Sequence, residues 1–244
     1  MRFLVISDIH ANLAALEAVL ADAEGEWEQI WCLGDVVGYG PDPNECAALL
    51  QEHDHLTLSG NHDWAVLGKL DINAFNTEAR AAIQWTQETI TEETRQFLTE
   101  LPPQQVVPPL ALVHGSLRQP IWEYILDRRT AALNFAEMEG ETPYCLVGHT
   151  HMAVLFVEET EGTVDALAPD YGKPVALGEQ RLIINPGSVG QPRDSDPRAA
   201  YALLDMEAMT LEHRRVVYPI GQTQERMRRH NLPARLIKRL EHGW

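Results

Sequence analysis

The first 150 residues alternate between short apolar runs and longer segments whose apolar residues recur every three or four positions. Short apolar runs predict buried strands, and the longer period predicts helices with one apolar face. Leu13, Leu16 and Leu20, for example, fall on one face of a helix. The predicted strands are 3–6, 29–33, 55–58, 110–113 and 144–147, and the predicted helices are 12–20, 44–53, 130–138 and two within 73–101.

Beyond residue 150 strands and turns dominate, with predicted strands at 153–157, 181–184, 199–204 and 210–217. Leu232, Leu236 and Leu240 then recur at intervals of four, which predicts a C-terminal helix over about 221–242 that packs on the body. Helices that alternate with strands, followed by a strand-rich half, predict an α/β core with a second sheet packed on it. We find no repeat, low-complexity tract or linker, so a single domain of residues 1–244 is expected.

Composition and charge narrow the classes of partner. The chain has 244 residues, 45% of them hydrophobic, and a formal charge of -17. Such an acidic protein repels nucleic acid and anionic lipid, so neither is expected as a partner. No apolar run approaches the 18 residues or so that a membrane span needs. Cys32, Cys46 and Cys145 form no CxxC pair, which predicts a reduced, cytoplasmic protein. The oligomeric state stays open.

The charge is unevenly distributed along the chain. Residues 211–244 contain 8 basic and 3 acidic residues, whereas the first 210 residues contain 11 basic and 33 acidic ones. This favours a surface helix that packs on an acidic body, and an arm that recruits anions is the alternative. The pattern alone leaves the role of this segment undecided.

Five predicted strands each end in a turn that carries residues of the metal-binding type. In an α/β sheet, ligands and catalytic groups collect beyond the carboxyl ends of the strands. Glycines stand beside these groups, and glycine lets the chain turn sharply and approach an ion closely. The groups are Asp8 with His10, Asp35, Asn61 with His62, His114, and His149 with His151.

Seven oxygen and imidazole ligands could therefore meet at one edge. Seven are too many for one zinc ion and suit two metal ions that share a carboxylate. The mixture of carboxylate, imidazole and amide favours transition metals over calcium or magnesium. We expect two divalent ions, manganese first, with iron, zinc, nickel or cobalt as alternatives. The absence of thiolates from all five groups argues against a structural zinc site.

These blocks resemble the five motifs of the calcineurin-like metallophosphoesterases. They are Ser7-Asp8-Ile9-His10, Gly34-Asp35, Gly60-Asn61-His62-Asp63, His114-Gly115 and Gly148-His149-Thr150-His151. A later block, from Asn185 to Arg193, resembles the small phosphodiesterase branch of bacteria and archaea. The resemblance implies a four-layer α/β/β/α sandwich of two mixed sheets flanked by helices, with a dinuclear metal site.

The resemblance also implies how the ligands divide between the two ions. One ion would take Asp8, His10, Asp35 and His151, and the other Asp35, Asn61, His114 and His149, so that Asp35 bridges them. Two cations about 3.5–4 Å apart lower the pKa of a bridging water and aim the hydroxide at phosphorus.

Four further residues are candidates for catalysis or substrate binding. His62 is expected to face the leaving oxygen as general acid or charge stabiliser. Asp63 would orient His62, or would simply begin a helix. Arg193 would grip phosphate, or would pair with Asp194 or Asp196 on the surface. Asn12 could touch phosphate, but is better placed as the N-cap of the following helix.

The predicted activity is that of a metal-dependent phosphoesterase acting on small phosphodiesters. Protein phosphatases and dinucleotide hydrolases of the superfamily carry Asp-Arg-Gly soon after the second motif, whereas this chain has no arginine between Gly34 and Pro41. That departure favours a small phosphodiester over a phosphoprotein or dinucleotide. The alternatives are a nuclease or phosphomonoesterase of the same superfamily, or a non-catalytic interaction module on this scaffold.

Overall fold

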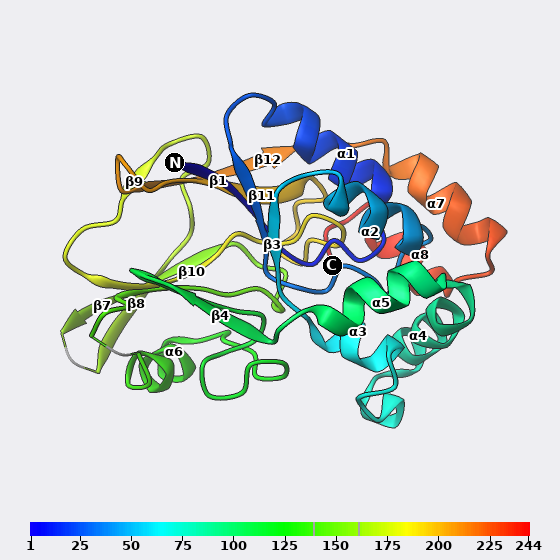
Figure 1. Ribbon diagram of the computed structural model, residues 1–244, viewed down its shortest axis with the longest axis horizontal. Coiled ribbons are helices and arrows are strands. Elements are labelled where there is room, and N and C mark those ends of the chain that lie inside the picture. The colour runs from blue at the N-terminus through cyan, green and yellow to red at the C-terminus, as the bar shows by residue number, and fades with distance from the viewer. Residues whose placement is uncertain (139, 161) are drawn as a thin grey trace.

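The computed structural model describes residues 1–138, 140–160 and 162–244, and its strands form two six-stranded sheets (Figure 1). The first sheet has the order β3-β2-β1-β11-β12-β9, and the second β4-β5-β6-β10-β7-β8. The first consists of β1 (Arg2–Ile6), β2 (Gln29–Cys32), β3 (His55–Thr57), β9 (Val175–Ala176), β11 (Ala199–Asp205) and β12 (Thr210–Val216). The second consists of β4 (Gln104–Val107), β5 (Leu110–Val113), β6 (Tyr144–Leu146), β7 (Val154–Thr160), β8 (Thr163–Leu167) and β10 (Arg181–Asn185).

Both sheets are mixed. In the first, β1, β2 and β3 run parallel, and β11 pairs antiparallel with β1 and with β12. In the second, β5, β6 and β10 run parallel, and β10 pairs antiparallel with β7. The carboxyl ends of β1, β2 and β3 therefore share one edge, and those of β5 and β6 share another.

Helices cover the outer faces of both sheets (Figure 1). The first sheet packs on α1 (Leu13–Asp22), α2 (Pro43–Gln51) and α5 (Glu92–Glu100), and the second packs on α6 (Arg128–Phe135). The remaining helices are α3 (Asn61–Val66), α4 (Thr77–Thr89), α7 (Ile220–Arg229) and α8 (Ala234–Arg239), with a 3₁₀ turn at Ile72–Ala74. The predicted four-layer arrangement of two mixed sheets between helices is confirmed.

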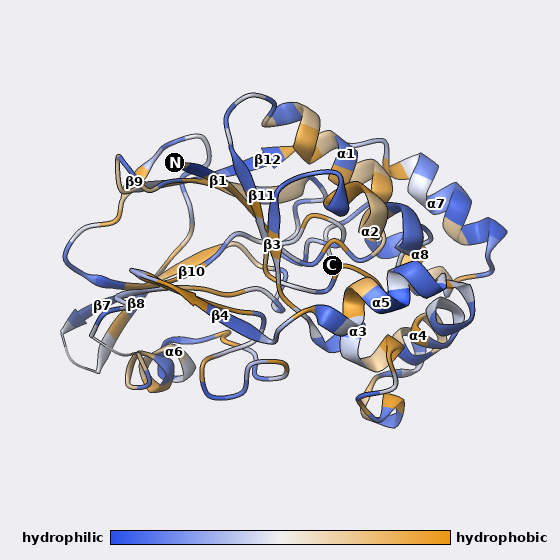
Figure 2. Cartoon of the chain, viewed as in Figure 1, coloured by the Kyte–Doolittle hydropathy of each residue, from blue (hydrophilic) through white to orange (hydrophobic). Residues whose placement is uncertain are grey.

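The alternation of side chains along β1 shows how the layers form. Leu4 and Ile6 join the core between the first sheet and its helices, whereas Phe3 and Val5 join the core between the two sheets. Successive strand residues point to opposite faces, so a run of apolar residues fits a strand buried on both sides. Figure 2 shows hydrophobic residues concentrated along α1 and many strands, whereas much of α7 is hydrophilic.

Two expectations need correction, and three strands were missed. The C-terminal segment forms two helices instead of one over 221–242, because Pro233 cannot continue a helix and disfavours the helical region for the residue before it. The short helix α3 begins where a turn was expected. The strands β4, β8 and β9 were not predicted. Among the described residues, no helix combines the length and apolar character needed to cross a membrane.

Candidate active site

The seven predicted ligands lie at the carboxyl ends of strands from both sheets. Asp8 and His10 follow β1, and Asp35 follows β2. Asn61 starts α3 just after β3, His114 follows β5, and His149 and His151 follow β6. All seven side chains are buried, with relative exposures of 4% or less. The carboxyl ends of strands from both sheets therefore border one polar cluster.

One group of ligand atoms gathers around Asp8 and His10. The Nε2 atoms of His10 and His151 lie 3.0 Å apart, and His151 Nε2 lies 3.2 Å from Asp8 Oδ1. His10 Nε2 is also 3.5 Å from Asp35 Oδ2. Ligand atoms of these four residues all lie within 4.8 Å of one another, which makes the group able to hold a metal ion.

A second group shares Asp35 with the first. His114 Nε2 lies 3.4 Å from Asp35 Oδ2 and 3.2 Å from Asn61 Oδ1. Asp35, His114 and His149 likewise offer ligand atoms within 4.8 Å of one another. The structure thus brings together every residue of both predicted ligand sets, with Asp35 in both groups.

The unsatisfied carboxylate oxygens fit a cation. Asp8 Oδ1 and Asp35 Oδ2 are buried without a hydrogen-bond partner in the described structure. The other oxygen of each is held, since His149 N donates to Asp8 Oδ2 at 3.0 Å and His62 N donates to Asp35 Oδ1 at 2.8 Å. Buried carboxylate oxygens are costly unless they are paired or coordinate metal. The donor set therefore suits divalent ions.

The outer contacts fix which imidazole nitrogen faces inward. The Nδ1 atoms of His10, His114 and His151 lie 3.2, 2.8 and 2.6 Å from the carbonyl oxygens of Val37, Leu33 and Gln191. A ring nitrogen that donates to a carbonyl leaves the opposite nitrogen with its lone pair free for a metal. His149 is reversed, because its Nε2 lies 3.2 Å from Trp122 O.

Burial and charge set the protonation states. Burial lowers the pKa of His149 to about 3 and that of His10 and His151 below the usual value, which leaves three neutral imidazoles at neutral pH. Burial opposes the charged form of Asp8 and Asp35, but nearby imidazoles outweigh it and lower the pKa of both carboxyls. His114 differs, since Asp35 outweighs burial and raises its pKa to about 9.

The backbone is strained at these ligands. Five of them have a positive φ, in the left-handed region that L-residues seldom adopt. Such strain costs about 1–3 kcal/mol per residue and concentrates at functional sites. The five are Asp8 (53°), His10 (49°), Asp35 (54°), His149 (65°) and His151 (60°).

His62 and Asp63 both lie close to the ligands, but their contacts differ. The His62 ring is 3% exposed, and its Nδ1 has no partner among the described residues. Asp63 instead accepts hydrogen bonds from the backbone N–H groups of Gly60, Val36 and Val37. The geometry therefore favours Asp63 as the residue that fixes the start of α3, and no contact supports an orienting role toward His62.

The contacts of Asn12 and Arg193 also favour different roles for the two residues. Asn12 caps α1 by accepting from Ala15 N, and its amide donates to Gly190 O, which leaves phosphate binding without support. Arg193 does not pair with Asp194 or Asp196 in the described structure, and its guanidinium instead lies 5.7 Å from the centre of the Tyr39 ring. The surface-pair alternative for Arg193 is therefore wrong.

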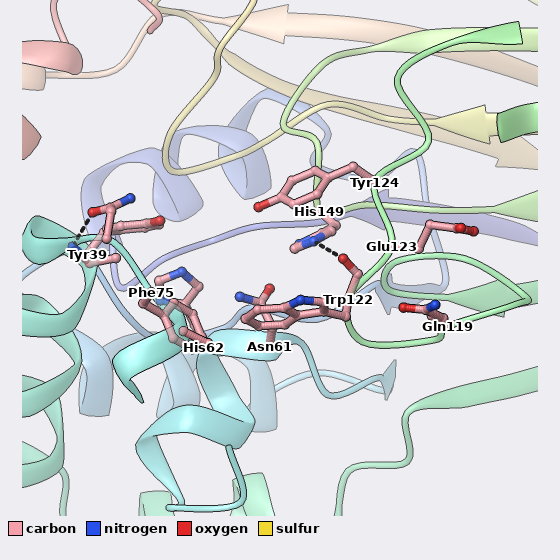
Figure 3. A pocket seen from close by; sticks show the side chains of 12 residues that line it. Tyr39, Asn61, His62, Phe75, Gln119, Trp122, Glu123, Tyr124 and His149 are labelled. Carbon is pink, nitrogen blue, oxygen red and sulfur yellow. Dashed lines mark hydrogen bonds between the residues drawn. The ribbon is translucent and has the colours of Figure 1, made fainter. Parts of the chain in front are cut away.

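A cavity of about 420 Å³ opens beside Asn61, His62 and His149 (Figure 3). Aromatic side chains form much of its wall. Phe75 meets Trp122 edge to face with ring centres 5.2 Å apart, and Tyr124 stacks on His149 at 3.8 Å. Phe75 and Tyr124 were not predicted as part of the site, because they lie in segments without a periodic pattern.

Comparison with known proteins agrees with this geometry. Residues 1–209 match the family described as the calcineurin-like phosphoesterase superfamily domain. An uncharacterized protein of Methanocaldococcus jannaschii is 38% identical over 243 residues, covering 97% of this chain and 96% of that protein. The crystal structure of a metallophosphoesterase from Sphaerobacter thermophilus is 46% identical, with a TM-score of 0.91, and the match covers 100% of this chain and 99% of that one. A hypothetical protein from Pyrococcus horikoshii is similar in fold, with 22% identity, a TM-score of 0.81, and coverage of 100% and 98%. The chain therefore belongs to the calcineurin-like phosphoesterase superfamily and is a metal-dependent phosphoester hydrolase.

Proposed function

We propose that this protein is a dinuclear metal-dependent phosphodiesterase that cleaves small phosphodiesters. The observation that carries the proposal is the convergence of seven buried donors in two groups that share Asp35. Manganese is the expected metal, and iron, zinc, nickel and cobalt suit the same donors. When bound, such a pair of ions activates water and neutralises charge on phosphate.

The chain's own residues would divide the remaining work. Asn61 is a neutral donor, which limits negative charge where a phosphate must bind. Burial lowers the pKa of His62 to about 4, but a phosphate beside the ring favours its protonated form. His62 would then donate a proton to the leaving oxygen as the bond between phosphorus and that oxygen breaks. The oxygen of a water molecule would form the new bond to phosphorus. Arg193 is the guanidinium that would bind a phosphate group of the substrate outside the seven donors.

The cavity supports a diester over a monoester. A monoester presents only phosphate oxygens beyond its leaving group, whereas a diester brings a second esterified group that needs room. The space beside Asn61 and His149 is about 420 Å³, and Phe75, Trp122 and Tyr124 give it an apolar wall. Aromatic walls suit a planar ring of the substrate. Three free, buried cysteines favour a cytoplasmic location for this reaction.

The test is turnover of bis(4-nitrophenyl) phosphate by protein loaded with manganese or nickel, with metal content determined on the same preparation. We expect hydrolysis that a chelator abolishes, and a lower kcat/KM for 4-nitrophenyl phosphate. Asp35→Asn tests the ligand that both groups share. Loss of a residue that only supports a metal ligand typically lowers activity 10–100-fold, so loss of this ligand itself should lower activity by more than that. Metal-loaded protein without turnover of any phosphoester would contradict the proposal and favour a non-catalytic module.

A nuclease of the same superfamily is the remaining alternative. It predicts salt-sensitive binding of single-stranded DNA, since phosphate contacts weaken steeply as salt rises. The charge of -17 argues against it. Absence of binding at low salt would exclude this alternative and would leave the small-substrate proposal intact.

A further inference from the structure

The C-terminal helix α8 places a second guanidinium beside Arg193. Arg193 Nη2 and Arg239 Nη1 both donate to one acceptor, Gln191 Oε1, at 2.9 and 3.0 Å. Gln191 is buried, and its backbone oxygen lies 2.6 Å from the ring of His151. Two cationic groups are thus anchored side by side on the segment that also supports one of the metal-site histidines.

Neither arginine forms an ion pair within the described part of the chain, and the Nε atom of each is buried without a hydrogen-bond partner. Arg226 and Arg215 also have a buried Nε without a partner, but both form ion pairs, because Arg226 lies 3.0 Å from Asp42 and Arg215 pairs with Asp194. Burial and the proximity of Arg193 lower the pKa of Arg239. Two adjacent cations without a counter-ion, in a protein of charge -17, leave room for an external anion.

The position of the pair connects it with the active site. The Arg193 guanidinium lies against the Tyr39 ring, whose centre is 4.2 Å from that of His62. Arg239 lines a cavity of about 250 Å³ together with Arg235 and Asn76. Asn76 also lines the main cavity beside His62, so the two cavities have this one lining residue in common.

One acidic group faces the smaller cavity. Glu78 lines it and lies 3.8 Å from Arg235. That separation is the loose spacing of an exposed pair, which contributes little energy. Glu78 therefore offsets the charge of Arg235 in part and also acts on Arg239, but among the described residues it forms an ion pair with neither Arg193 nor Arg239.

We propose that Arg193 and Arg239 bind a second anionic group of the substrate, of the phosphate type, while the phosphate to be cleaved lies at the seven donors. The inference rests on the proposed phosphodiesterase function and names its substrate class, a phosphodiester that carries a further phosphate. Guanidinium groups suit this task because their N–H groups match phosphate oxygens in pairs. The basic C-terminal segment would then contribute to specificity.

The test compares two substrates that differ by one phosphate. They are thymidine 5′-(4-nitrophenyl phosphate) and the same compound with a 3′-phosphate, and both release 4-nitrophenol. The wild-type protein should favour the phosphorylated compound in kcat/KM by roughly tenfold to a hundredfold, the range for hydrogen bonds between charged groups. Arg239→Gln should bring that ratio close to one through KM. Lys238→Gln, which removes the same charge from an exposed neighbour on α8, should keep it.

Calorimetry separates failure of this inference from failure of the proposed function. Metal-loaded protein should bind thymidine 3′,5′-bisphosphate more tightly than thymidine 5′-phosphate, and Arg239→Gln should remove that difference, whether or not either ester is hydrolysed. Equal affinities in the wild-type protein, or an Arg239→Gln variant that keeps the preference, would overturn the inference. Turnover of both esters at equal kcat/KM would overturn it as well, and would leave the phosphodiesterase function standing.

Discussion

At the scale of single residues, what a side chain does here depends on whether its polar atoms are already engaged. Asp63 and Asn12 have theirs occupied by backbone groups, so they stabilise turns. His62 is buried against Tyr39 and Phe75 with ring centres 4.2 and 5.3 Å away, and its buried Nδ1 has no hydrogen-bond partner among the residues that the structure describes. Because His62 also lines the main cavity beside Asn61, a proton donor at this position is held next to the place where a phosphoester would bind.

We therefore predict that His62→Asn lowers kcat by about 10²–10⁴, the range for loss of a positioned general acid. Metal content should not change, because His62 belongs to neither group of ligand atoms. Steady-state kinetics and elemental analysis of the same preparation measure both quantities. His242→Asn is the control, since that ring stacks on Trp244 near the C-terminus. A His62→Asn protein with normal kcat would remove His62 from the mechanism.

A second histidine gives a prediction on stability. His213 is 1% exposed and its Nε2 lies 2.9 Å from Asn185 O; burial lowers its pKa to about 4. In the unfolded chain this histidine has a pKa near 6.5, so as pH falls it binds a proton there before it does so in the folded protein. The neutral, buried imidazole therefore stabilises the fold fully above pH 6.5, and this stabilisation is lost as pH falls toward 4. At 1.36 kcal/mol per pKa unit the total is about 3 kcal/mol, of which about 2 are lost between pH 7 and 5.

Denaturant unfolding at pH 7 and pH 5 measures this loss. His213→Gln retains a group able to meet Asn185 O but cannot titrate, so its stability should fall by about 2 kcal/mol less than that of the wild-type protein over the same interval. The other buried histidines titrate in both proteins, and the comparison removes their contribution. Identical pH dependence in the two proteins would assign the loss of stability to those other groups.

At the scale of elements, the tight turns after the strands hold the ligands in place. Gly60 lies directly before α3, and a Cβ built on it would stand 2.0 Å from Asp35 Oδ1. Real atoms never approach so closely, so any side chain at this position must displace the carboxylate shared by the two ligand groups. The close packing of the backbone at Gly60, after β3, thus determines the position of Asp35, which follows β2.

Gly60→Ala should therefore destabilise the fold by about 1–3 kcal/mol, the usual cost of overpacking, and lower both metal content and activity. Gly221→Ala in α7 is the matched control, because its Cβ would meet no atom within 4 Å. In a helix that change should stabilise the protein by up to about 1 kcal/mol. Thermal unfolding and metal analysis report both effects. Full metal content in Gly60→Ala would show that the turn yields without moving Asp35.

Elements also show what the sequence can predict. The buried strands β1, β2, β5 and β6 were found because their apolar runs match strands covered on both sides. The edge strand β4 was missed because Gln104 and Gln105 are exposed and give no apolar signal. The ligands were predictable because parallel strands end at one edge. The contacts of Asp63, and the cavity wall at Phe75 and Tyr124, depend on segments distant in sequence that local pattern does not reveal.

At the scale of the whole molecule, the C-terminal helices attach to the body mainly through apolar packing. Leu236 is 2% exposed and belongs to a cluster that joins α7 and α8 to α4 and the loop of Tyr39; its other buried members are Ala79, Ala82, Met227, Leu232, Ile237 and Leu240. Charge contributes less, because a surface ion pair such as Arg235–Glu78 adds about 0–1 kcal/mol. The basic character of the segment is then available for other tasks, such as the anion site at Arg239.

Leu236→Ala should destabilise the protein by about 2–5 kcal/mol, the cost of a cavity in a buried cluster. Because Tyr39 belongs to the same cluster and contacts His62, activity should fall too, well before global unfolding. Lys238→Ala on the same helix is exposed and should change stability by no more than about 0.5 kcal/mol. Unfolding curves followed in parallel by circular dichroism and by residual turnover distinguish the two effects. If activity and global structure are lost together, the C-terminal helices are one cooperative unit with the body, and Tyr39 has no separate sensitivity to them.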